Sequence, residues 1–222
     1  MVSSIPLFPL GTVLFPGVML PLHIFEPRYR MLIRDLMAAP EGSRAFGVVG
    51  IREGREVGIG AISQLHAIGC TAELRRVEAL PDGRFYIVAT GGSRFRVLDL
   101  DTSEELARAA VEFLDEPETD GADEVAEQVA AAFMRYYHAL LAAQGNASDD
   151  DLDLPDRPRD LAYAVADAML LDDGEKQQLL AASSTNTRLE MELALLQRET
   201  AMVGQFGMRP AVELQHPAYN EN

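Results

Sequence analysis

The sequence predicts an α+β protein in which a small β-barrel-like domain with one helix is followed by a C-terminal helical bundle. Its 222 residues are long enough for two modest domains with buried cores. The apolar residues recur with strand-like spacing in the first half and with helical spacing from about residue 120 onward. Charge changes at nearly the same place, because residues 1–100 hold 11 Arg against 9 acidic residues and residues 101–160 hold 4 Arg against 17. We therefore expect a β-rich subdomain over 1–117, a helical-bundle subdomain over 118–203 and a flexible tail over 204–222.

The chain opens with a long apolar stretch that has no charged side chain before Glu26. Four prolines between residues 6 and 21 would break a continuous helix, and no basic residue precedes the stretch. These features disfavour both a membrane-spanning helix and a secretory signal. We expect two short buried strands with turns, and then a helix that begins at Pro27 and ends at Pro40. The residues that share the apolar face of this helix are Tyr29, Leu32, Ile33, Leu36 and Met37.

Further short apolar runs, each bounded by Gly, Pro or Asp, predict strands. The tripeptide Pro81–Gly83 has the residue types of a hairpin turn between two of them. The Gly91–Ser93 segment predicts a second turn before the following strand. Several short strands with one helix are typical of a compact, partly closed β-barrel. The predicted strands are Ala45–Gly50, Val57–Ile62, Leu65–Leu74, Phe85–Thr90, Phe95–Leu100 and Ala109–Leu114.

The second half has the signals of about four helices. An apolar stripe runs from Val125 to Leu140, and Pro158 begins the next helix. Asp172 with Glu175, and Thr187 with Glu190, match the capping-box pattern that begins helices. Each helix is too short to be stable alone, so we expect them to pack as a bundle.

Three stretches together resemble the N-terminal domain of Lon protease, in particular its stand-alone bacterial form. They are the LFPL, LFPG and LPLHIFEPRYR elements at the start, IGCTAELRRVEALPDGRFYIVATGGSRFRV from Ile68, and LAYAVADAMLLDDGEKQQLLAASSTNTRLEMELALLQRE from Leu161. The resemblance covers about residues 5–200, with Cys70 standing where the family often has Thr. It implies the same architecture, a β-domain followed by a helical part.

The resemblance also implies a function. In Lon this domain helps to recognise unfolded or degron-bearing proteins, so we expect a non-enzymatic protein- or peptide-binding module, an adaptor in protein quality control. Full Lon adds an ATPase and a Ser–Lys peptidase, but this sequence has no Gly-x-x-x-x-Gly-Lys-Ser/Thr loop. Its single lysine, Lys176, lies in a predicted helix surface with no desolvated pocket to activate a nucleophile. We therefore expect no ATPase or protease activity, no catalytic residues and no cofactor.

The predicted binding surface lies near the start of the chain. An exposed strand edge can add a peptide strand, and apolar side chains beside it can hold hydrophobic residues of a client. The turn around Pro16 and the first turn of the helix are the places where side chains should be partly exposed, although burial is the competing expectation for each apolar residue. The candidate peptide-binding residues are Phe15, Met19, His23, Arg28 and Tyr29.

Other chemistry is disfavoured. His23 and Glu26 are more typical of a hydrogen-bonded structural pair than of a metal site. A single cysteine, Cys70, fits a small core residue in a cytoplasmic protein. The acidic balance disfavours nucleic acid and anionic membranes as partners. The alternative function is a small-molecule-binding or hydrolytic protein on the same scaffold; the oligomeric state and the client stay open.

Overall fold

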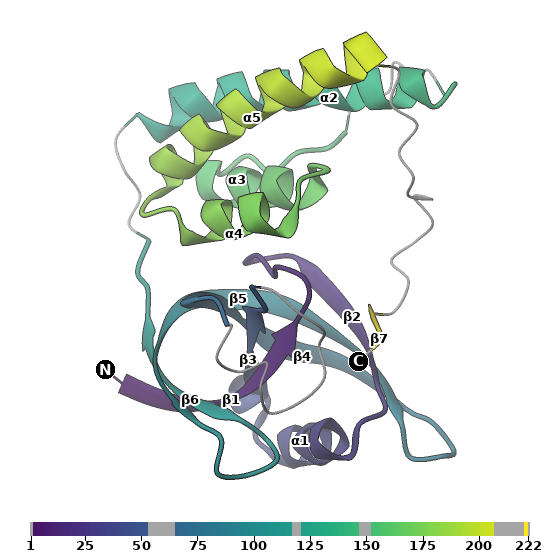
Figure 1. Cartoon of the computed structure of the whole chain (residues 1–222), viewed down its shortest axis with the longest axis vertical. Helices are drawn as coiled ribbons and strands as arrows, with labels where there is room; N and C mark the ends of the chain where they lie inside the picture. Colours follow the sequence, from purple (N-terminus) through teal and green to yellow (C-terminus); the bar gives the residue numbers. More distant parts are fainter. Residues whose placement is uncertain (1, 53–64, 117–120, 147–151, 207–219, 222) are drawn as a thin grey trace. The chain divides into compact units, whose positions relative to one another are not determined.

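The computed structural model describes residues 2–52, 65–116, 121–146, 152–206 and 220–221 (Figure 1). The chain divides into two compact units. Unit 1 comprises Met1–Asp115, Leu171–Leu180 and His216–Asn222, and unit 2 comprises Glu116–Leu170 and Ala181–Gln215. The predicted subdomain boundary at 117 and the predicted tail stay predictions about folding and mobility.

Unit 1 contains a seven-stranded mixed sheet with the order β4-β3-β1-β6-β5-β2-β7. Strand β1 pairs in parallel with β3 and antiparallel with β6, and β4 pairs with both β3 and β5. Five strands therefore form a ring of pairings, β1-β3-β4-β5-β6. The α+β class is confirmed, whereas the description of this sheet as a barrel stays a prediction. The strands are β1 (Val2–Leu10), β2 (Met19–Ile24), β3 (Ala45–Gly50), β4 (Ile68–Ala79), β5 (Phe85–Asp101), β6 (Arg108–Phe113) and β7 (Asn220–Glu221).

The predicted strand Ala45–Gly50 is β3 with the same bounds. The prediction of two strands with a turn at Gly91–Ser93 is wrong, because β5 runs through this segment. The glycines serve close packing instead: a Cβ on Gly91 would overlap the carbonyl oxygen of Phe15, and one on Gly92 would lie 2.6 Å from Thr71 Oγ1. The register of β4 against β5 shifts here, as a β-bulge requires. The predicted strand Val57–Ile62 lies outside the described residues.

The hairpin predicted at Pro81–Gly83 is present between β4 and β5. Gly83 has φ +80°, a conformation that glycine adopts without strain, and its N–H donates to the carbonyl of Leu80 at 2.9 Å. Asp82 Oδ1 accepts from the Arg84 N–H at 3.1 Å. Local turn chemistry therefore fixes this hairpin.

Helix α1 (Pro27–Ala38) covers the main core of unit 1. Its proline stands at the first helical position, where a missing N–H costs nothing. Met37 is 45% exposed, so its predicted place on the buried face is wrong. The helix residues that are buried against the strands are Tyr29, Leu32, Ile33 and Leu36.

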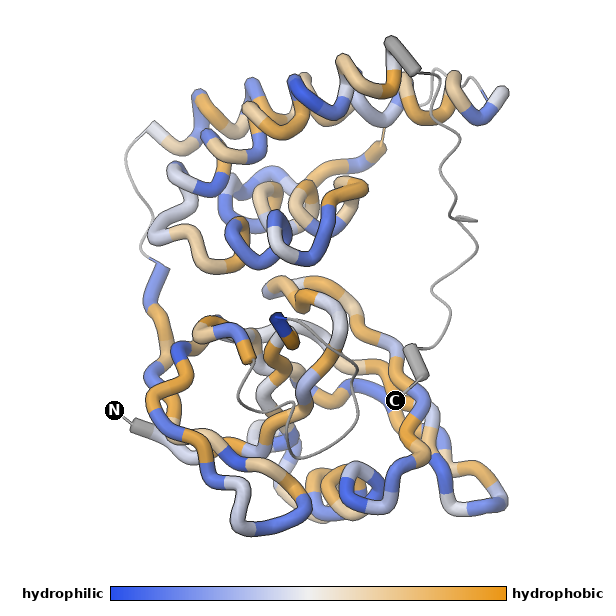
Figure 2. The backbone as a smooth tube through the Cα atoms, viewed as in Figure 1, coloured by the Kyte–Doolittle hydropathy of each residue, from blue (hydrophilic) through white to orange (hydrophobic). Residues whose placement is uncertain are grey.

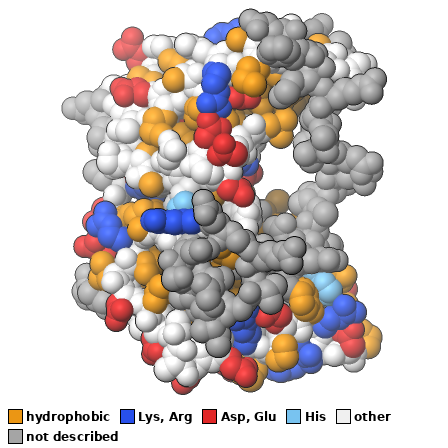
Figure 3. Space-filling view, viewed as in Figure 1, with side chains coloured by type: hydrophobic (Ala, Val, Ile, Leu, Met, Phe, Trp, Pro, Cys, Tyr) orange, Lys and Arg blue, Asp and Glu red, His pale blue; other side chains and the backbone are white. Residues whose placement is uncertain are grey.

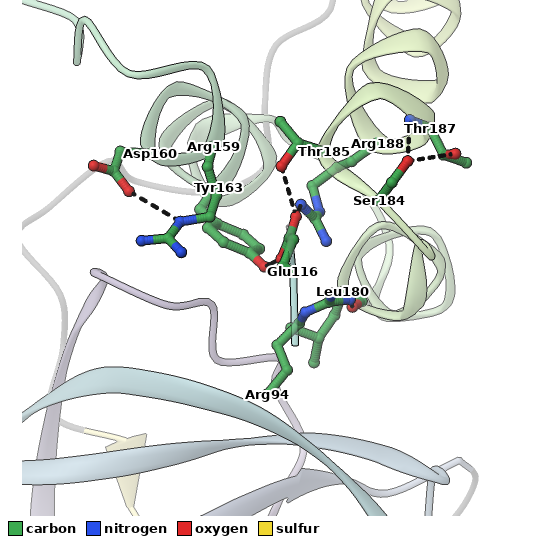
Figure 4. Close-up of polar contacts among 10 residues, drawn as sticks. All are labelled: Arg94, Glu116, Arg159, Asp160, Tyr163, Leu180, Ser184, Thr185, Thr187 and Arg188. Carbon is green, nitrogen blue, oxygen red and sulfur yellow. Dashed lines mark hydrogen bonds and ion pairs between the residues drawn. The ribbon is translucent and has the colours of Figure 1, made fainter. Parts of the chain in front are cut away.

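Helix α4 (Asp173–Ala181) packs with the sheet of unit 1, although it lies far along the chain. The buried guanidinium of Arg94, on β5, donates to the carbonyl of Leu180 at 2.8 Å (Figure 4). Gln177 Nε2 donates to the carbonyl of Ile68, at the start of β4, at 3.0 Å. A cation at the C-terminal end of a helix also meets the negative end of the helix dipole. The expected four-helix bundle is therefore not confirmed.

Unit 2 contains α2 (Ala122–Ala143), α3 (Pro158–Ala168) and α5 (Thr185–Phe206), which pack pairwise on one another. Hydrophobic and hydrophilic residues alternate around the turns of α2 and α5, as expected of helices with one buried side (Figure 2). In unit 1, the predicted cap before α4 is present, because Asp172 Oδ1 accepts from the Glu175 N–H at 2.8 Å. The Thr187 cap is wrong, because α5 begins earlier and Ser184 Oγ accepts from the Thr187 N–H at 3.2 Å.

A buried polar cluster joins the first residue of unit 2 to two of its helices (Figure 4). The Glu116 carboxylate accepts hydrogen bonds from Tyr163 of α3 and from Thr185 and Arg188 of α5. The Arg188 guanidinium lies 4.2 Å from the centroid of the Tyr163 ring. The side chains of Arg188 and Glu116 are 0% and 5% exposed, so this ion pair is shielded from water.

Glu192, one turn beyond Arg188 on α5, is also fully buried, and neither of its carboxylate oxygens has a hydrogen-bond partner among the described residues. Burial raises the pKa of Glu192 well above its ordinary value of 4.5, and the nearby Arg188 opposes this only in part. The folded protein therefore retains a proton that the unfolded chain releases, and stability must fall as the pH rises above about 4.5 toward the folded-state pKa.

We expect the Glu192→Gln variant to lose this part of the pH dependence, because an amide does not titrate. Urea unfolding measured from pH 5 to pH 9 should show a stability advantage of the variant that grows with pH. Glu190→Gln is the matched control on the exposed side of the same helix. A constant difference between Glu192→Gln and the original protein across this range would contradict the assignment.

Candidate functional site

The outward face of β2 and the adjoining part of β5 is apolar. Along β2 the buried residues alternate with Met19, Pro21 and His23, which are exposed or half-buried. In the register of the two strands, Pro21 lies opposite Val88 and His23 lies opposite Tyr86. We call these five residues the outer patch. A sheet face turned to water ordinarily carries polar side chains, so this face is unusual for a solvated sheet.

Aromatic contacts hold one end of the outer patch. The His23 ring lies 4.7 Å from the Tyr86 ring and 5.9 Å from the Phe25 ring, measured between centroids. Phe25 is 39% exposed and Met19 is 71% exposed. Arg76 and Glu78, both exposed, lie opposite Val88 and Tyr86 on the other side of β5. The patch therefore has a charged rim along β4, the usual arrangement at protein-binding surfaces.

The side of β2 that faces away from β5 carries a second feature. Strand β7 pairs with β2 in parallel, with Asn220 opposite Leu22 and Glu221 opposite His23. An added strand at this position shows that the backbone of β2 can accept an extended segment. Apolar side chains also reach the surface between charged ones on the face drawn in Figure 3, so exposure of an apolar side chain does not by itself distinguish the outer patch.

The structure brings two of the five predicted binding residues, Met19 and His23, onto one face. Phe15 is 0% exposed and Tyr29 is 4% exposed, with the Tyr29 ring stacked on Phe8 at 3.8 Å between centroids. Arg28 lies at the start of α1, where it pairs with Glu26 at 2.8 Å. The premise that the turn around Pro16 exposes its apolar residues is therefore wrong for Phe15.

The predicted hydrogen-bonded pair of His23 and Glu26 is not formed. Glu26 engages Arg28, and His23 Nε2 is buried with no hydrogen-bond partner among the described residues. Sequence reasoning missed Pro21, Tyr86 and Val88. The alternation was readable in the segment from Met19 to Ile24, but on β5 both faces are apolar, which hides the two-residue period.

The described part of the chain contains neither a reactive thiol nor a group of side chains placed to bind a metal ion. Burial raises the pKa of the Cys70 thiol to about 12, so it remains protonated and unreactive at neutral pH. Among the described residues, no group of three His, Cys, Asp or Glu side chains is placed to hold a metal ion. No described helix is long and apolar enough to cross a membrane.

The fold and the outer patch together define an α+β module with an apolar sheet face as its accessible feature. The family model of the ATP-dependent protease La (LON) substrate-binding domain matches residues 4–198. The chain belongs to this family, which confirms the resemblance noted from its motifs.

Relatives place this domain within larger proteins. Lon protease 2 of Sorangium cellulosum is 27% identical over 207 residues, and Lon protease of Escherichia coli K12 is 28% identical over 198 residues. These alignments cover 89% and 88% of this chain but 25% of each relative. The chain therefore spans about a quarter of the length of the curated relatives that it matches.

Solved structures show the same fold. A Lon N-terminal domain protein from Xanthomonas campestris is 26% identical with a TM-score of 0.62, covering 86% of this chain and 98% of that one. The N-terminal domain of Mycobacterium avium complex Lon protease, 20% identical with a TM-score of 0.56, covers 90% of this chain and 98% of its own. The second likeness supports the fold alone.

Proposed function

We propose that this chain is a non-catalytic module that binds exposed apolar segments of unfolded or degron-bearing proteins in the cytoplasm, as an adaptor in protein quality control. The observation that carries the proposal is the outer patch, in which every outward position of β2 holds an apolar or aromatic side chain. The description of the family as a substrate-binding domain supports the same reading.

The geometry suits an extended client segment. Outward side chains on a strand recur every second residue, so a client strand that runs along β2 would place alternate side chains over Met19, Pro21 and His23. Main-chain hydrogen bonds to the edge of β2, beyond the residues Leu22 and His23 that pair with β7, would supply affinity, and the patch would supply preference for apolar residues. One small patch gives weak binding, and several copies acting together would raise it by avidity.

The test is to make the outer patch polar. We expect Met19→Ser combined with Val88→Ser to lower the affinity for a permanently unfolded, carboxymethylated model protein by about tenfold or more, because each covered apolar side chain contributes roughly 1.5–3 kcal/mol. Fluorescence anisotropy titration of the labelled model protein measures this. Phe15 is unsuitable for the test, because it is buried and its substitution would report on folding.

The matched control is Met37→Ser, since Met37 is 45% exposed on α1 and does not belong to the outer patch. It should leave the affinity unchanged. An equal loss in both variants, or no binding by the original protein at high micromolar concentration, would refute the proposed surface.

A further inference from the structure

Two arginines of α1, Arg30 and Arg34, place their guanidinium groups beside the hairpin turn that joins β4 to β5. They stand four residues apart, so they lie on the same side of the helix. A Cβ built on Gly83, at the tip of the β4–β5 hairpin, would lie 3.8 Å from Arg34 Nη2 and closer still to Arg30 Nη2. Two like charges thus converge on one point, an arrangement that costs free energy unless an anion binds between them.

Packing holds both groups in place. The Arg34 guanidinium lies 5.8 Å from the centroid of the Phe85 ring, within the range of a cation–π contact. Arg30 Nε is buried without a hydrogen-bond partner in the described structure, whereas its terminal nitrogens are not among the buried atoms that lack a partner. Each side chain is therefore anchored along its length and can present its terminal N–H groups outward.

The neighbouring carboxylates do not neutralise this pair. Glu26 pairs with Arg28 at 2.8 Å, and Asp82 pairs with Arg84 at 2.6 Å. Across the described ranges, neither Arg30 nor Arg34 forms an ion pair. Guanidinium groups bind carboxylates through two parallel hydrogen bonds, so a preformed pair of them suits one carboxylate well.

The arginine pair lies at the end of the sheet toward which β2 runs. Ile24, the last residue of β2, pairs with Phe85, and the Phe85 ring is the one beneath Arg34. The chain then enters α1 at Pro27. Phe85 is buried and faces the core beneath α1, so the arginines lie on the α1 side of this end of the sheet, and a segment that follows β2 past Ile24 reaches them by turning over the end of the sheet.

We propose that Arg30 and Arg34 bind a carboxylate of the client, so that the preferred client segment is apolar and ends in an acidic group. This inference rests on the proposed function and names the chemistry of its partner. The carboxylate can come from an Asp or Glu side chain or from the C-terminus of the client, and the two sources share the same recognition.

The experiment uses the full chain and three fluorescein-labelled peptides that share one apolar sequence. The first ends in Asp-Asp and is amidated, the second ends in Asn-Asn and is amidated, and the third ends in Asn-Asn with a free carboxylate. We expect the first peptide to bind about tenfold more tightly than the second at low ionic strength, a gain that shrinks as salt screens the charges. A gain for the third peptide identifies the C-terminus as an equally good source.

The double variant Arg30→Gln with Arg34→Gln should bind the acidic and neutral peptides equally. Arg75→Gln is the matched control, because Arg75 is 57% exposed and already pairs with Glu73. If the double variant loses its circular-dichroism signal, Arg34→Gln alone tests the same point, because Arg34 is exposed. Each single or double variant is compared with the original protein on all three peptides.

The outcomes separate this inference from the proposed function. Equal binding of the acidic and neutral peptides by the original protein overturns the carboxylate site but leaves the outer patch intact. Binding of the acidic peptide alone, sensitive to the arginines and insensitive to Met19→Ser with Val88→Ser, supports the carboxylate site and refutes the outer patch. An equal loss in Arg75→Gln, or no binding of any peptide, overturns the inference.

Discussion

Replacing Arg188 by methionine is expected to destabilise unit 2 by about 3–5 kcal/mol, the usual cost of removing one partner of a buried ion pair. The Arg188 side chain is 0% exposed, and its removal leaves the Glu116 carboxylate charged in an environment that is 5% exposed. It also removes the guanidinium that lies over Tyr163. Hydrogen–deuterium exchange in α3 and α5, together with urea unfolding, measures the effect.

Two further variants test the cause. Arg159→Met removes an arginine of unit 2 whose ion pair with Asp160 has side chains that are 41% and 45% exposed, and it should cost less than about 1 kcal/mol. Adding Glu116→Gln to Arg188→Met should recover part of the lost stability, because the unpaired buried charge is then gone. If adding Glu116→Gln lowers the stability of Arg188→Met further instead of restoring part of it, the unpaired buried charge is not the cause of the loss.

Gly91→Ala is expected to destabilise unit 1 by about 3 kcal/mol, the upper range for inserting a group into a packed site. The new Cβ would overlap the Phe15 carbonyl oxygen and would lie 3.2 Å from Pro16 Cα, both of which are backbone atoms. Backbone hydrogen bonds of 2.8 Å tie Gly91 to Gly17 and to Val18, so the segment cannot simply move aside. Thermal unfolding followed by circular dichroism measures the change.

The control is Gly42→Ala, because a Cβ there meets nothing within 4 Å. Its effect on stability should lie within about 0.5 kcal/mol, as for ordinary surface substitutions. If Gly91→Ala unfolds at the same temperature as Gly42→Ala, the close approach of Phe15 to β5 is not a feature of the folded protein in solution.

The elements that sequence reasoning predicted well are those with local signals. A short apolar run with bounding residues defines β3, turn residues define the Pro81–Gly83 hairpin, and Pro27 defines the start of α1. The continuity of β5 was missed, because paired glycines are typical of turns and their packing role depends on Phe15 and Thr71, far away in sequence.

The candidate site was predictable only in part for the same reason. Met19 and His23 lie on the outward face because strand alternation puts them there, whereas Phe15 turns inward. The outward positions of β5 became recognisable only once its register with β2 was known. The Glu116–Arg188 pair joins residues 72 positions apart, a distance at which no spacing rule applies.

The association of α4 with the sheet has a consequence for synthesis on the ribosome. Unit 1 closes its ring of strands with β6, which ends at Phe113. The hydrogen-bond partners of the Arg94 guanidinium and of the Ile68 carbonyl, however, belong to residues 171–180. At roughly 5–20 residues per second, the ribosome needs several seconds to add the intervening segment. During that time the nascent sheet exposes a buried arginine and an unsatisfied strand end. We therefore expect its folding to be completed late in translation, after most of unit 2 has already emerged.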